Sequence, residues 1–275
     1  MTPPEDPRID WSYSNASLYE TCPRAFYYRH CGQSGVESTD SSNRRARSIG
    51  EAIGTAVHEG IASQMERWRV GKEPSLQAAQ SVAASHLATI HPENGAQACV
   101  DIESSSAQTT VQNHIQRFFH VIWSRFTTHR YITHEQTSMF EVEGNRVWAK
   151  ADLCTRDSDG TFVISDWKTR APDVFENRSL QLTLYTLWAQ TEFEPDVDRI
   201  RAQLIFTSNG EIVPQSVTES DLEELRSRIS ADLQVWNEEY TPSKFPVDPS
   251  AEKCSRCHYR PRCEAGQRAV KDDLK

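Results

Sequence analysis

The sequence lacks any long apolar run. Nowhere in its 275 residues do about 18 apolar residues follow one another, so no transmembrane helix and no membrane partner are expected. The first residues, MTPPEDPRIDWS, are acidic and lack the apolar segment of a secretory signal peptide. We therefore expect a cytoplasmic protein with reduced thiols, and its seven cysteines need an explanation other than disulfides.

The sequence also lacks an excess of positive charge. Its formal net charge of −9 does not favour a general nucleic-acid binder, although basic residues can still cluster locally. No GxxxxGK phosphate-binding loop is present, so ATP-driven unwinding of DNA would need a partner. The apolar fraction of 37% is enough for the core of one large domain.

Hydrophobic periodicity predicts a mixed α/β domain. The predicted helices cover residues 14–30, 49–69, 75–90, a long amphipathic stretch that includes 111–126, 177–191 and 219–239. The predicted strands cover 135–142, 146–155 and 161–168, and a hairpin covers 199–217. Loops are expected at 33–48 and 91–106, and a cysteine-rich tail ends the chain.

The stretch TFVISDWKTR carries opposite charges at the end of an apolar strand. Because side chains alternate along a strand, Asp166 and Lys168 should share one face and Trp167 should face away. The preceding strand carries Asp152, and the DSDG turn between the two strands can bring Asp152 close to Asp166. Two neighbouring carboxylates repel each other, and a hard divalent cation such as Mg²⁺ would bridge them. The alternative is a partly exposed strand with an ordinary Asp–Lys pair.

Two predicted helices each carry a pair of residues that could contribute to the same site. Gln181 and Tyr185 lie four residues apart, hence on one helix face, as do Gly54 and His58. Glycine at position 54 would let another backbone come close. Taken singly, each pair also fits an ordinary amphipathic helix with a boundary tyrosine or a structural histidine.

Together these residues resemble the RecB-like branch of the PD-(D/E)XK nucleases. The resemblance runs from about residue 12 to residue 264 and includes the opening SYSNASLYETCPRAFYYR. The ordered set consists of Gly54-x-x-x-His58, Asp152, Asp166-Trp167-Lys168 and Gln181-x-x-x-Tyr185. Ala151 stands where that family often has proline.

The resemblance implies a restriction-endonuclease-like core, in which helices flank a mixed central sheet, and residues 71–134 would be a helical insertion. It implies a Mg²⁺ or Mn²⁺ site made by His58, Asp152, Asp166 and the Trp167 carbonyl. Lys168 would position the attacking water, and Gln181 and Tyr185 would hold the lysine or the scissile phosphate.

The cysteines suggest a more specific branch. Cys254, Cys257 and Cys263 supply three metal ligands in the tail, and Cys22 is the candidate for the fourth. One early and three late cysteines resemble the iron–sulfur branch of these nucleases, which includes the AddB subunit and the CRISPR-associated Cas nucleases of type four. The resemblance implies a 4Fe–4S cluster that fixes the tail, about residues 242–264, to the N-terminal helix; structural Zn²⁺ is the alternative.

Positive charge is concentrated near these cysteines. Residues 22–48 and 242–275 each carry a net charge of +3, so the remaining chain carries −15. Within them, the candidate DNA contacts combine cations for phosphates with rings for bases: Arg24, Tyr28, Arg256 and Arg260. The alternative is a solvated basic surface.

The sequence thus predicts a metal-dependent DNA exonuclease acting on single-stranded or frayed ends. DNA repair, recombination and CRISPR adaptation are candidate pathways, with a helicase or CRISPR adaptation proteins as candidate partners. The alternatives are a non-catalytic DNA-binding module of the same fold and a structure- or site-specific endonuclease.

Overall fold

The computed structural model describes residues 8–30, 49–89, 100–170, 178–238 and 241–273. The predicted loop at 33–48, together with Cys31 and Cys99, lies outside these residues. The chain forms two compact units. Unit 1 contains residues 1–45, 139–148 and 224–275, and unit 2 contains residues 46–138 and 149–223. Among the described residues, no helix has both the length and the apolar character needed to cross a membrane.

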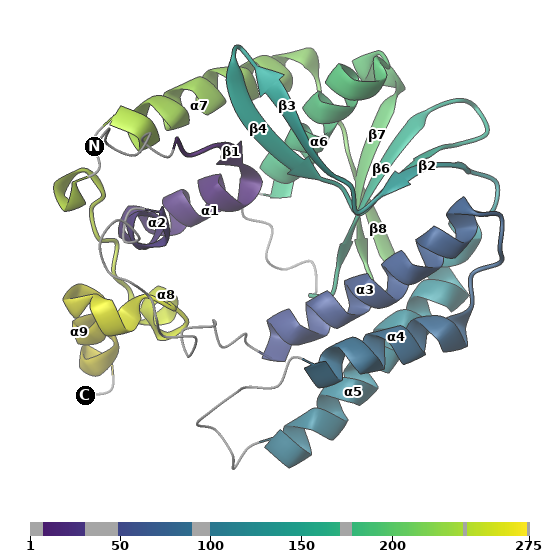
Figure 1. The fold of residues 1–275 in the computed structure, drawn as a ribbon, viewed down its shortest axis with the longest axis horizontal. Coiled ribbons are helices and arrows are strands. Elements are labelled where there is room, and N and C mark those ends of the chain that lie inside the picture. Colours follow the sequence, from purple (N-terminus) through teal and green to yellow (C-terminus); the bar gives the residue numbers. More distant parts are fainter. Residues whose placement is uncertain (1–7, 31–48, 90–99, 171–177, 239–240, 274–275) are drawn as a thin grey trace, which may run out of the picture. The chain divides into compact units, whose positions relative to one another are not determined.

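Unit 2 is built on a mixed sheet of five strands with the order β2-β5-β6-β7-β8 (Figure 1). β6 and β7 run parallel, and the other neighbours for which the pairing is described run antiparallel. The strands are β2 (Arg130–His134), β5 (Leu153–Arg156), β6 (Phe162–Lys168), β7 (Ile200–Phe206) and β8 (Glu211–Gln215). The predicted mixed α/β architecture is therefore confirmed.

Helices pack on both faces of this sheet. On one face, α3 (Ile49–Arg69), α4 (Leu76–Thr89) and α5 (Val100–Arg117) lie side by side (Figure 1). After α5, the chain continues through a π-helix (Phe118–Ile122) and a 3₁₀ turn (Trp123–Arg125). α6 (Arg178–Phe193) contacts β6 and β7 through side chains of the other face. These helices fall in predicted helical segments, but α5 begins at Val100, so the loop predicted for 91–106 is wrong in its last part.

The alternation predicted for β6 is confirmed. The Trp167 ring is 1% exposed and packs edge-on against Phe118 and Phe126, with centroid distances of 5.2 and 5.9 Å. Asp166 and Lys168 instead bond to Gln181 on α6. The sheet therefore separates an apolar core from a charged cluster.

Two predicted strands differ from the structure: one is split into two strands, and the other begins two residues later. The segment 146–155 forms β4 (Asn145–Lys150) and β5, which belong to different sheets and separate at Ala151 and Asp152. The segment 135–142 begins only at β3 (Thr137–Val142), because Glu135 has a left-handed backbone with φ of 49° and ends β2. Its N–H donates to the carbonyls of Ala151 and Asp152, at 3.1 and 3.2 Å. Backbone hydrogen bonds therefore join the end of β2 to the segment between β4 and β5.

Unit 1 combines a small sheet with helices from both ends of the chain. The sheet has the order β1-β4-β3, and β1 is Trp11–Ser12. The predicted helix at 14–30 is two helices, because Cys22 is extended and Pro23 starts the second one. The helices are α1 (Tyr13–Thr21), α2 (Pro23–His30), α7 (Glu219–Glu238, which begins in unit 2), α8 (Ala251–Ser255) and α9 (Glu264–Asp272), with 3₁₀ turns at Pro242–Lys244 and Arg260–Arg262.

Glycine is required at one position of α3 and not at another. A Cβ atom on Gly60 would lie 2.9 Å from the Ala79 carbonyl oxygen and 3.0 Å from the Ala83 Cβ, so α3 and α4 pack closely only because Gly60 has none. A Cβ atom on Gly54 would meet only the Thr169 side chain at 3.5 Å, an ordinary contact. The close backbone approach predicted at Gly54 is therefore found at Gly60.

This contrast gives a matched pair of variants. Gly60→Ala should lower the free energy of unfolding by about 1–3 kcal/mol, because the packed helices must move apart. Gly54→Ala should raise it by about 0.5–1 kcal/mol, because alanine favours the helix interior. Urea unfolding measures both changes. Equal effects of the two substitutions would contradict the close packing of α3 on α4.

Candidate active site

Two side chains are anchored to the peptide backbone at Trp167, near the end of β6. The Asp152 carboxylate, at the junction before β5, accepts a hydrogen bond of 2.6 Å from the Trp167 N–H. His58, from α3, lies 3.1 Å from the Trp167 carbonyl through Nε2. A carbonyl only accepts hydrogen bonds, so Nε2 carries a proton, and Nδ1 lies 3.4 Å from Asp152 Oδ1. The side chain of Trp167 fixes this backbone by its burial.

Glu135 joins this pair and was not identified from the sequence. Its Oε1 lies 3.6 Å from His58 Nδ1, and its Oε2 lies 2.5 Å from the ammonium group of Lys150. His58, Glu135 and Asp152 each offer one ligand atom, and these three atoms lie within 4.8 Å of one another. Glu135 reaches this position because of its left-handed backbone between two strands, which the apolar pattern of the sequence does not reveal.

The carboxylates determine the charge of the histidine. Burial alone would lower the pKa of His58, but Asp152 and Glu135 outweigh this effect and raise it well above its usual value. Burial raises the pKa of Asp152, but His58, the Trp167 N–H and Lys168 together lower it below its usual value. Without metal, the site therefore holds an imidazolium between carboxylates.

A second cluster occupies the α6 face of β6. The Lys168 ammonium lies 2.5 Å from Asp166 Oδ2 and donates to Gln181 Oε1 at 2.9 Å. The amide nitrogen of Gln181 donates to Asp166 Oδ1 at 3.1 Å and to the Tyr185 hydroxyl at 2.8 Å. The predicted face made by Gln181 and Tyr185 is therefore directed at the lysine–aspartate pair.

The buried charge in this cluster is only partly compensated. Burial raises the pKa of Asp166 to about 6 even though Lys168 lowers it, and repulsion from Asp152 raises it further. Burial, followed by Asp166 and Asp152, raises the pKa of Tyr185 well above its usual value, so the hydroxyl stays protonated. The carboxylates of Asp152 and Asp166 therefore repel each other where the two clusters meet, although each is paired with its own cation, His58 or Lys168.

The donor set fits a divalent cation. Glu135 Oε1 is buried, and in the described part of the chain it has only His58 Nδ1 near it, at 3.6 Å; the buried Asp166 Oδ2 faces only the Lys168 ammonium, at 2.5 Å. Carboxylate oxygens and one imidazole suit Mg²⁺ or Mn²⁺. His58, Glu135 and Asp152 would hold the cation, and His58 Nδ1 would lose its proton on binding. Asp166 faces Lys168 and Gln181 and does not belong to this group of three.

A further pair of residues holds the backbone of Lys168. The Thr207 N–H and hydroxyl both donate to the Lys168 carbonyl, at 2.9 and 3.2 Å. His114, on α5, contacts the same hydroxyl oxygen through Nδ1 at 2.9 Å. The hydroxyl proton is already used on Lys168, so His114 donates from Nδ1. This contact fixes the end of β6 from the helix side.

The four predicted cysteine ligands all lie in unit 1. Cys22 lies between α1 and α2, Cys254 lies on α8, and Cys263 precedes α9. A Cβ on Gly266 would meet the sulfurs of Cys254 and Cys263 at 3.4 and 3.6 Å, so a residue without a side chain faces both. Burial raises the pKa of Cys257, and the nearby Cys22 and Cys254 raise it further.

Two predicted DNA contacts have structural roles in unit 1. The Arg24 guanidinium donates to the carbonyls of Phe245 and Pro242, at 2.8 and 2.7 Å. The Tyr28 hydroxyl donates to the Arg262 carbonyl at 3.2 Å, which joins α2 to the cysteine-rich tail. Arg256 is exposed, and half-buried Arg260 donates to the Ser255 carbonyl at 3.4 Å. A DNA-binding role for these four residues stays a prediction.

One comparison with known proteins identifies a family. A sequence model of the PD-(D/E)XK nuclease superfamily matches residues 10–264. A search of curated proteins gives no match. Solved structures that are similar include the crystal structure of SSO0001, which is 16% identical. That match covers 78% of this chain and 85% of the other, with a TM-score of 0.33.

The raised pKa of Asp166 predicts how stability depends on pH. The folded chain binds this proton more tightly than the unfolded chain, so the free energy of unfolding falls as pH rises from about 4 to about 6. The Asp166→Asn variant has no ionisable group at this position, so it does not lose stability in this way as pH rises. At pH 7 in EDTA, it should be more stable than the wild type by about 1–3 kcal/mol in urea unfolding. Lower stability of the variant under these conditions would contradict a net cost of the buried charge.

Proposed function

The chain belongs to the PD-(D/E)XK nuclease superfamily, and from this we propose that it is a metal-dependent nuclease that hydrolyses phosphodiester bonds in DNA. The observation that carries the proposal is the convergence of His58, Asp152 and Lys168 on the end of one strand. A protein that only binds DNA has no need for buried charge at this cost.

The metal would be held by His58, Asp152 and Glu135, with Asp166 and the Trp167 carbonyl as the further ligands that the family resemblance implies. When bound, a divalent cation polarises a phosphoryl oxygen and lowers the pKa of a bound water. The protein keeps the donors in place beforehand: the Trp167 backbone orients His58 and Asp152, and Lys150 holds the Glu135 carboxylate.

Lys168 is the proposed catalytic cation. Its ammonium would position the attacking water and offset the negative charge that develops on the phosphate. Gln181 keeps Lys168 beside Asp166 by bonding to both, and Tyr185 holds Gln181 in turn. Gln181 and Tyr185 are therefore positioning residues in this proposal.

The proposed substrate is single-stranded DNA or a frayed duplex end, cleaved as by an exonuclease. This part of the proposal rests on the resemblance to RecB-like nucleases. A non-catalytic DNA-binding module would bind the same DNA without cleaving it. An endonuclease would open closed circular duplex DNA, which has no end. Candidate partners remain a helicase or CRISPR adaptation proteins.

Lys168→Ala tests the catalytic role. With Mn²⁺ and end-labelled single-stranded DNA, the variant should cleave at least about 100-fold more slowly than the wild type, because it cannot stabilise the developing charge. Lys72→Ala removes an exposed lysine outside the site and should keep the wild-type rate. Full activity in Lys168→Ala, or no cleavage by the wild type in any divalent metal, would refute the proposal.

We also propose that Cys22, Cys254, Cys257 and Cys263 bind a 4Fe–4S cluster. All four cysteines belong to unit 1, and the sulfurs of Cys254 and Cys263 both lie close to Gly266. Four thiolates can bind either a 4Fe–4S cluster or zinc. The choice of iron rests on the resemblance to the iron–sulfur branch of these nucleases.

Cluster binding predicts colour and metal content. Protein purified without oxygen should be brown and contain iron, and Cys254→Ser should lose both because one ligand is missing. Cys154→Ala is the control, since this buried cysteine lies in unit 2, and the variant should keep its iron. About one zinc and no iron per chain in anaerobic protein would replace the cluster with a structural zinc site.

A further inference from the structure

The sheet face that packs against α3 and α5 changes character along its length. Toward the catalytic end it is apolar, with Leu153, Trp167 and Ile205 in the core cluster. Toward the other end, the same face carries Thr155, Ser165 and Gln203, which are polar and buried. Burying polar groups has a cost that an apolar core would avoid. This polar part of the face needs a further explanation.

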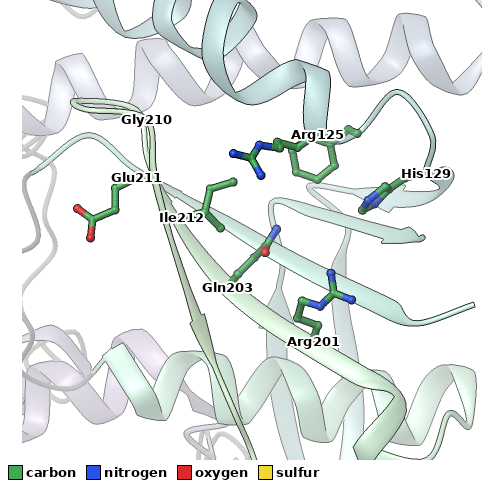
Figure 2. Close-up of a pocket in the computed structure, with 8 residues that line it drawn as sticks. Arg125, His129, Arg201, Gln203, Gly210, Glu211 and Ile212 are labelled. Carbon is green, nitrogen blue, oxygen red and sulfur yellow. The ribbon is translucent and has the colours of Figure 1, made fainter. Parts of the chain in front are cut away.

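Gln203 of this polar part and the neighbouring His129 form the polar floor of a pocket, and Ser165 and Thr155 bond to these two residues without lining the pocket themselves. The pocket has a volume of about 600 Å³ and lies where the helical layer ends after Arg125. Figure 2 shows Arg125, His129, Arg201 and Gln203 around one space, with the Glu211 carboxylate turned away from it. All lining residues belong to unit 2.

Existing contacts hold the floor in place. The Gln203 amide donates to the Ser165 hydroxyl at 3.0 Å, and His129 Nδ1 lies 2.9 Å from the Thr155 hydroxyl. The floor is thus preorganised, and the second ring nitrogen of His129 is not used by this contact. Burial lowers the pKa of His129, Arg201 lowers it further and Asp157 partly opposes both, so the ring is neutral.

The cations on the rim differ in how far they are neutralised. The Arg201 guanidinium pairs with Asp157 Oδ2 at 2.9 Å. Arg125 is exposed, and within the described part of the chain no hydrogen-bond or ion-pair partner is found for it. A guanidinium matches the geometry of a phosphate, to which it can donate two parallel hydrogen bonds. The rim therefore has one uncompensated cation beside a polar floor.

We propose that this pocket binds a phosphorylated ligand of nucleotide size, with Arg125 as the principal contact to the phosphate. A volume of about 600 Å³ is typical of small-molecule sites and far exceeds that of a single phosphate group. The neutral imidazole of His129 and the Gln203 amide are available for the polar body of the ligand. The same chemistry is offered by a free mononucleotide and by the phosphorylated end of a DNA strand.

The pocket is distinct from the candidate active site. Side chains of β7 alternate, so Arg201 and Gln203 share a face with Ile205, which packs in the α3–α5 core. Asp166 and Lys168 point to the opposite face, toward α6. Arg201 and Gln203 also pair with Val163 and Ser165, before the catalytic end of β6. The proposal therefore does not depend on cleavage by the active site.

Equilibrium binding of full-length protein tests the proposal in EDTA, where metal-dependent cleavage is suppressed. The three probes are deoxyadenosine monophosphate, a short oligodeoxynucleotide with a 5′-phosphate, and the same oligonucleotide without it. We expect the phosphate to strengthen binding and Arg125→Ala to weaken it about tenfold or more, the effect of losing a charged hydrogen bond. Arg125→Glu should weaken binding further.

Arg130→Ala is the matched control, because Arg130 is an exposed arginine of unit 2 that does not line the pocket. It should change affinity by less than about twofold. Tighter binding of the mononucleotide would identify a free nucleotide as the ligand, and tighter binding of the phosphorylated oligonucleotide would identify a strand end. Equal affinities of Arg125→Ala, Arg130→Ala and wild type, or no saturable binding of any probe, would overturn the proposal.

Discussion

Burial of two carboxylates next to each other is the constraint on which the arrangement of unit 2 depends. Asp152 and Asp166 are 7% and 2% exposed, so solvent does little to screen their repulsion. Each has a separate compensating partner: His58 for Asp152, and Lys168 for Asp166. The two partners come from opposite faces of the sheet. β6 supplies Asp166 and Lys168 to one face of the sheet, and its buried Trp167 anchors the backbone that holds His58 and Asp152.

The part of the site that follows strand periodicity could be predicted from the sequence. The separation of Asp166 and Lys168 from Trp167 needs only the alternation of side chains, and Gln181 with Tyr185 needs only the helical repeat. Glu135 could not be predicted in this way. Its position depends on a left-handed residue where two strands of different sheets separate, and tertiary contacts to Ala151 and Asp152 determine that junction.

The same limit applies to the basic residues of unit 1. A cluster of arginines and tyrosines indicates nucleic acid when only composition is considered. In the structure, Arg24 satisfies the carbonyls of a segment more than two hundred positions away in the sequence. Such a contact depends on the tertiary structure, and it cannot be predicted from the residues next to Arg24 in the sequence. The fold class was predictable, whereas the partners of Arg24 were not.

The division of the chain into units has a consequence for the order of its synthesis. Unit 2 has all of its residues once position 223 has been added. Unit 1 needs α1 and α2, made first, and α7 to α9, made last. Domains fold as units while the chain emerges from the ribosome. The N-terminal helices are therefore made before their partners, and Phe26 lacks the Trp236 and Phe245 rings that cover it while unit 2 already folds.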